Sequence, residues 1–153
     1  MSEPNHAGNI IVNLASLPDF LRKPILKKRM DEFFTLSAPD RIEIINNALA
    51  AGPTIPFPNF AKLFGTWLEI LAGIDEEKRS GMFSAYLTEI VTNPQKLVLF
   101  NLDGILEIFN GLEKPKKDAI SNSIRRILAG LTDEQRRRLD LIIPQSAKAA
   151  LGI

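Results

Sequence analysis

The chain has 153 residues, of which 45% are apolar, and it carries 19 basic and 18 acidic side chains. This length is enough for one substantial hydrophobic core and short for two domains. The net charge of +1 produces no global field that would attract the protein to nucleic acid or anionic lipid. Cysteine is absent, which excludes disulfides, thiolate nucleophiles and cysteine-based metal sites.

The sequence contains no apolar stretch long enough to span a membrane and no basic-then-apolar leader. We therefore expect a cytoplasmic protein with no membrane span. Residues 1–13, which include the only histidine, His6, have the composition of a flexible leader. Residues 14–153 are predicted to form a single helical domain.

Apolar residues recur at spacings of three and four along most of the chain, which is typical of amphipathic helices. A proline within a helix costs about 3 kcal/mol, so we expect Pro24 to begin a helix and not to interrupt one. The only strand-like segment, Asn9–Val12, is too short and isolated to form a sheet. The pattern predicts helices over residues 18–34, 38–50, 58–72, 75–91, 95–110, 115–129 and 132–143, and a short final turn from Ser146.

An internal repeat is the most informative feature of the sequence. Segments Ile70–Arg79 and Ile127–Arg136 share one pattern, and related copies begin with an apolar anchor, followed by a cation five residues later and an apolar residue eight residues later. The anchors are Leu17, Leu36, Ile74, Leu112 and Leu131, separated by 19, 38, 38 and 19 residues. The cations are Arg22, Arg41, Arg79, Lys117 and Arg136, and the second apolar residues are Ile25, Ile44, Met82, Ile120 and Leu139.

Each copy of the repeat is interpreted as the end of one helix, a turn and the start of the next. Ser37, Asp75 and Thr132 are residue types that cap helix N-termini well. Glycines before the anchors, at positions 73, 111 and 130, are expected to supply the left-handed residue that ends the preceding helix. The predicted fold is all-α, a short helical-repeat (α-solenoid-like) stack of about three antiparallel helix hairpins with a 38-residue period.

The stretch from Leu131-Thr132-Asp133-Glu134-Gln135-Arg136 to Ile143-Pro144-Gln145-Ser146 resembles the joints in the short-helix superhelical domain of MgtE-type magnesium transporters and of the flagellar motor-switch protein. The resemblance implies the architecture of stacked short helices. It carries over no functional residues.

The cations of the repeat have two possible roles. Equivalent residues of a repeat protein can form a ligand-binding row along one surface. The alternative is local pairing, because Asp75 precedes Arg79 by four residues and Glu113 precedes Lys117 by four, which is the spacing of a helix salt bridge. Local pairing is the favoured interpretation.

The C-terminal third, residues 112–153, is the most basic part of the chain, with nine basic and five acidic residues. A basic patch can bind nucleic acid by neutralising phosphates. Consecutive arginines on a helix point about 100° apart, however, so they cannot all face one groove. A solvated face or an acidic protein partner is favoured over nucleic acid, and the candidate contact residues are Arg125, Arg126, Arg136, Arg137 and Arg138.

Three aromatic residues, Phe60, Phe64 and Trp67, lie at helical spacing and are normally core residues. In a short superhelix one face stays uncovered, so these side chains are also candidates for a partner-binding surface. Near the N-terminus, Phe20–Met30 has the pattern of a basic amphipathic segment that could contact a membrane or another protein.

The sequence contains no arrangement of residues that indicates catalysis, and no cofactor-binding or metal-binding pattern. We expect a protein-interaction or scaffolding module, not an enzyme, that binds a protein partner or associates with itself. The alternative is a nucleic-acid-binding accessory protein that uses the basic C-terminal third.

Overall fold

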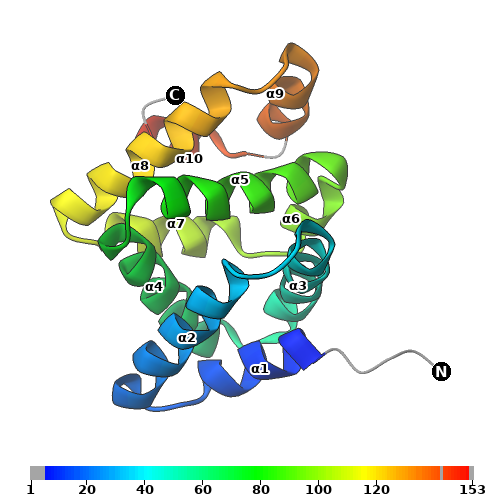
Figure 1. The fold of residues 1–153 in the computed structure, drawn as a ribbon. Helices are drawn as coiled ribbons and strands as arrows, with labels where there is room; N and C mark the ends of the chain where they lie inside the picture. Colours follow the sequence, from blue (N-terminus) through cyan, green and yellow to red (C-terminus); the bar gives the residue numbers. More distant parts are fainter. Residues whose placement is uncertain (1–5, 142, 152–153) are drawn as a thin grey trace.

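The structure is a computed structural model, and it describes residues 6–141 and 143–151. All regular elements in these two ranges are helices, which confirms the predicted all-α class (Figure 1). They are α1 (His6–Ala15), α2 (Asp19–Phe33), α3 (Ala38–Ala51), the 3-10 turn η1 (Gly52–Thr54), α4 (Phe57–Gly73), α5 (Glu76–Thr92), α6 (Gln95–Val98), α7 (Leu102–Asn110), α8 (Lys114–Ala129), α9 (Asp133–Asp140) and α10 (Gln145–Leu151).

The helices pack mainly against neighbours that are not adjacent in the chain. Helix α1 packs against α3, α2 against α4, α3 against α5, and α5 against α8. Helix α4 also packs against α1, α7 and α8, so it lies among elements from both halves of the chain (Figure 1). The predicted hairpins of neighbouring helices are not formed by α2 with α3 or by α4 with α5, because these pairs share little contact.

Five joints between helices share one local geometry, and we call them corners. Each corner is centred on one of the predicted anchors Leu17, Leu36, Ile74, Leu112 and Leu131, which forms a bend one to three residues after the last residue of a helix. The anchor N–H donates to the carbonyl three residues earlier, at 3.2 to 3.4 Å. The next residue is an extended N-cap, with φ from −59° to −70° and ψ from 147° to 161°. The anchors are therefore locally equivalent.

The cation of each corner donates to a carbonyl at the end of the preceding helix. These carbonyls have no N–H partner within their own helix, so the cation caps the helix that ends at the corner. In four corners the acceptor lies eight residues back, and the bonds join Arg22 Nε to Leu14 O (3.1 Å), Arg41 Nε to Phe33 O (3.2 Å), Arg79 Nη1 to Leu71 O (3.1 Å) and Arg136 Nε to Leu128 O (3.1 Å). In the fifth, Lys117 Nζ donates to Asn110 O at 3.4 Å.

The cations are thus structural, but the predicted partners are wrong. The carboxylate of Asp75 accepts from the backbone N–H of Lys78 as an N-cap, so Arg79 pairs instead with Glu76, at 2.7 Å. The glycines before the anchors also differ from expectation, since none of them has a positive φ. The corners close with the anchor N–H bond and the cation, which removes the need for a left-handed residue.

Two segments near the N-terminus differ from the sequence prediction. Residues 6–13 form most of α1 instead of a leader, because Leu14 and Ala15 are buried and Ile10 and Ile11 pack against the core; residues 1–5 lie outside the described residues. Pro24 lies inside α2. It is tolerated there because it is on the exposed side of the helix, where water can satisfy the carbonyl that lacks a partner.

The helix predicted over residues 95–110 is divided into α6 and α7 by Leu99–Asn101. The side chain of Asn101 accepts from Gly104 N–H at 3.0 Å and begins α7 as its N-cap. No helix in the described ranges is both long and apolar enough to cross a bilayer.

Candidate functional site

A cavity of about 560 Å³ lies between the helices, and part of its boundary is open to solvent. Its lining residues come from α1 to α8 and from α10. The lining is almost wholly apolar. The charged residues among the described lining are Arg29 and Glu32, both on α2.

An aromatic wall forms one side of this cavity, and we define it as Phe60, Phe64 and Trp67 of α4 with Phe83 and Tyr86 of α5. The ring centroids are 5.5 Å apart for Phe60 and Phe64, 5.7 Å for Phe64 and Trp67, and 5.4 Å for Trp67 and Tyr86. The structure therefore brings the three predicted aromatic residues together. They line this cavity, where Phe60 is buried and Phe64 and Trp67 are half-buried, and their role in binding a partner stays a prediction.

The aromatic wall also supplies two polar groups, the indole N–H of Trp67 and the hydroxyl of Tyr86. Burial raises the pKa of Tyr86 to about 12. Its hydroxyl therefore stays neutral at ordinary pH and can donate or accept a hydrogen bond. The cavity suits an apolar molecule with few polar atoms.

The almost wholly apolar lining offers few hydrogen-bond partners to water. Water gains little there, because it needs two or more polar partners. Apolar matter is thus the most favourable occupant.

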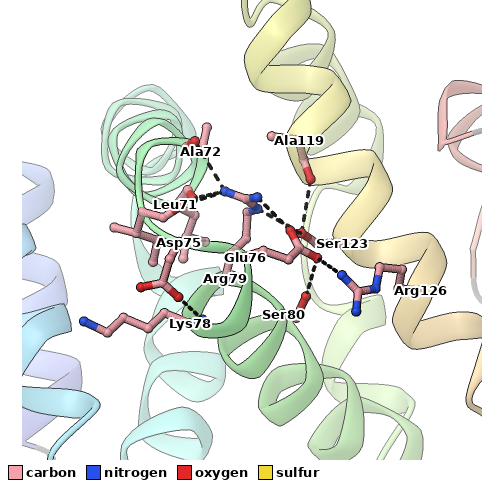
Figure 2. A network of polar contacts seen from close by, with 11 residues as sticks. Leu71, Ala72, Asp75, Glu76, Lys78, Arg79, Ser80, Ala119, Ser123 and Arg126 are labelled. Atoms are coloured by element: carbon pink, nitrogen blue, oxygen red, sulfur yellow. Dashed lines mark hydrogen bonds and ion pairs between the residues drawn. The ribbon is translucent and has the colours of Figure 1, made fainter.

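A polar cluster joins α5 to α8 beside the third corner (Figure 2). Oε1 of Glu76 accepts from Ser80 at 2.8 Å and from Arg126 at 3.1 Å, and Oε2 accepts from Arg79 at 2.7 Å and from Ser123 at 2.8 Å. Burial opposes ionisation of Glu76, but the hydrogen bonds from Ser80, Ser123 and Arg79 outweigh it and lower the pKa to about 2. This carboxylate fastens two helices and holds no spare proton for acid–base chemistry.

The five candidate arginines of the C-terminal third contact their own chain. Arg126 reaches Glu76, and Arg136 caps Leu128 O. The other three bonds join Arg125 Nη2 to Asn122 Oδ1 (2.6 Å), Arg137 Nε to Asp133 O (3.4 Å) and Arg138 Nη2 to Glu134 Oε1 (3.0 Å). These contacts use only part of each exposed guanidinium, and no observation favours the nucleic-acid alternative.

The described residues contain no cluster of His, Asp and Glu that could hold a metal ion. Sequence reasoning missed the cavity, although the aromatic spacing on α4 was a signal for its wall. The sequence analysis also gave little weight to the exposed side of α2, where Phe20 and several lysines lie close together in the sequence.

Comparison with known proteins assigns the chain to no family. No family model matches the chain, and no curated protein or solved structure is significantly similar to it. The cavity and its surroundings are therefore the basis for a functional proposal.

Proposed function

We propose that this protein binds a single-chain amphiphile, such as a long-chain fatty acid, whose apolar chain occupies the cavity. The observation that carries the proposal is an apolar volume of about 560 Å³ lined from α1 to α10. This volume lies in the range of small-molecule sites, about 300–1,000 Å³. Each methylene that is removed from water contributes about 0.8 kcal/mol, so chain length can supply the affinity.

The form of the cavity favours a narrow chain over a partner helix. Lining residues such as Leu26, Leu63 and Leu68 are buried, and an α-helix is about 10 Å across with its side chains. A helix would have to separate the surrounding helices, whereas a hydrocarbon chain would not. The polar end of the ligand belongs near Arg29 and Glu32, which are half exposed and mark where the lining meets water.

Trp67 provides a direct test, because it is the only tryptophan and lies in the aromatic wall. Fatty acids of increasing chain length should change its fluorescence saturably. Affinity should rise about fourfold for each added methylene until the chain exceeds the cavity. Absence of a saturable change from octanoate to stearate would overturn the proposal.

Matched substitutions locate the ligand. Ala48 and Ala147 line the cavity, whereas Ala129 is exposed and does not line it. Ala48→Leu and Ala147→Leu should each weaken fatty-acid binding at least tenfold, and Ala129→Leu should leave it unchanged. Equal affinities in all three variants would place the ligand elsewhere. Two independent lining variants are used because overpacking of one site can disturb folding.

The second candidate is a protein-interaction or scaffolding module that binds a protein partner or a second copy of itself. The observation that favours it is the exposure of Val98 (60%) and Leu99 (69%) where α6 ends, since exposed apolar side chains often mark interfaces. The α-solenoid-like stack predicted from the 38-residue spacing is the architecture on which this candidate function depends. Light scattering after size-exclusion chromatography should then show a dimer that Val98→Ser with Leu99→Ser converts to a monomer. A monomer throughout would exclude self-association.

A further inference from the structure

The outer side of α2 combines exposed apolar and basic side chains. Phe20 is 74% exposed, Leu21 40% and Ile25 38%. Lys23, Lys27 and Lys28 are exposed on the same helix. We call these six residues the α2 face.

The inner side of α2 is fixed to the core, so the orientation of the α2 face is fixed as well. Leu26, Met30 and Phe33 are buried at helical spacing. Arg22 is also buried, and it donates to Leu14 O at 3.1 Å and to the carbonyl of Leu17. These bonds anchor the N-terminal half of α2, and Phe20 and Ile25 therefore remain directed outward.

The α2 face carries positive charge that forms no ion pair within the part of the chain that the structure describes. Asp19 pairs with Arg22 at 2.5 Å and Glu32 pairs with Arg29 at 3.3 Å. None of the three lysines of the α2 face forms an ion pair with a described residue. Asp31 is the remaining acidic residue of the helix, so the groups of α2 outside these two pairs carry a net charge of +2.

We propose that the α2 face docks on a membrane surface that contains anionic lipid. Apolar side chains flanked by lysines are typical of helices that lie in the interface plane, where the lysine ammonium groups reach the headgroups while their stems stay in apolar surroundings. Lysines act as flexible point charges, which suits the diffuse charge of lipid headgroups. The face is the outside of a helix, which can lie flat on a broad surface such as a bilayer.

Docking does not depend on the cavity ligand, although α2 also supplies Arg29 and Glu32 of the cavity lining. Because α2 contributes both to the cavity lining and to the docking surface, the opening of the cavity would lie close to the bilayer. The two proposals fail separately, because fatty-acid titration of Trp67 needs no vesicle and vesicle binding needs no fatty acid.

Vesicle sedimentation of the full chain tests the proposal, with phosphatidylcholine vesicles that contain or lack phosphatidylglycerol. A lysine near an anionic surface strengthens binding about fivefold, so three lysines should give on the order of 100-fold preference for the anionic vesicles. The preference should disappear at about 1 M salt, where the screening length falls to about 3 Å. Absence of binding to anionic vesicles at low salt overturns the proposal.

Two matched pairs of variants assign the binding to the α2 face. Changing Lys23, Lys27 and Lys28 to Gln should remove the preference, whereas changing Arg125, Arg137 and Arg138 to Gln removes the same charge and should leave it. Phe20→Ser should weaken binding at least tenfold, and Leu141→Ser, at a residue that is 86% exposed, should not.

Equal losses within either pair contradict the assignment, because they would make binding a property of total charge or of any exposed apolar residue. Capture of the protein by polyglutamate as tightly as by anionic vesicles would also overturn the proposal in favour of an acidic protein partner. Circular dichroism of each variant verifies that it is folded.

Discussion

On α8 and α9, arginines donate to carboxylates and carbonyls of their own chain, as Arg126 does to Glu76 and Arg136 to Leu128 O. On α2, by contrast, Lys23, Lys27 and Lys28 form no ion pair with a described residue. The two regions are both basic in sequence, and they differ in whether the cations form hydrogen bonds or ion pairs with described residues. Clustered charge therefore does not by itself indicate a binding surface.

The position of a cation relative to a corner explains the difference. A cation five residues after an anchor is the fourth residue of the new helix. It lies beside the carbonyls that end the preceding helix and donates to them. The lysines of α2 do not occupy that position, which belongs to Arg22. They are exposed, whereas Leu26 and Met30 of the same helix are buried.

The largest expected effect comes from substituting Arg79, the cation with the most hydrogen bonds among the described corner cations. Arg79→Met should lower the free energy of unfolding by about 3 kcal/mol, because Leu71 O, Ile74 O and the Glu76 carboxylate lose a buried donor. Urea unfolding measures the loss. Lys28→Met is the control and should change stability by less than about 0.5 kcal/mol. Similar losses in the two variants would contradict the comparison.

Neighbouring arginines of α9 sharpen the comparison within one helix. Arg136 caps Leu128 O at 3.1 Å, whereas Arg137 has only a marginal bond to Asp133 O at 3.4 Å. Arg136→Ala should cost about 1 to 2 kcal/mol and Arg137→Ala less than about 0.5 kcal/mol. Thermal unfolding measures both losses. A larger loss for Arg137→Ala than for Arg136→Ala would contradict this prediction.

The Glu76 cluster should make stability depend on pH in the acid range. The pKa of the Glu76 carboxyl is lowered from an ordinary 4.5 to about 2. The contribution of Glu76 to the free energy of unfolding is therefore complete above about pH 4.5 and is lost as the pH falls toward 2. The effect is smaller than that of Arg79→Met because the side chain is partly exposed. Urea midpoints between these pH values should fall more steeply for the natural chain than for Glu76→Gln, and parallel curves would refute this role.

The smallest effect is expected for the α2 face. Changing Lys23, Lys27 and Lys28 together to Gln should alter the free energy of unfolding by less than about 0.5 kcal/mol, because these side chains have no described ion-pair partner. A larger loss in urea unfolding would mean that the lysines have structural partners and are not free for a membrane.

Local features of the fold could be predicted from the sequence. Anchors such as Leu36 and Ile74 lie at equivalent corners because caps, bends and helix starts depend on a few consecutive residues. The division between α6 and α7 was not predicted, since apolar periodicity continues through Leu99 and Phe100 while the N-cap of Asn101 sets the boundary.

The site was less predictable because it depends on packing between distant segments. Spacing was enough to place Phe60, Phe64 and Trp67 on one helix face. Whether they line a cavity depends on how α5 and α7 pack around α4. The same limit explains the arginines, since nothing local to Arg126 indicates Glu76, 50 residues away.

The corner bonds also bear on how the chain folds. Each links residues no more than eight positions apart, and contacts of short sequence separation cost little loop-closure entropy and form rapidly. The cavity lining, in contrast, joins α1 to α10 and can close only after the intervening chain has collapsed. During refolding, native corners should therefore precede the native surroundings of Trp67.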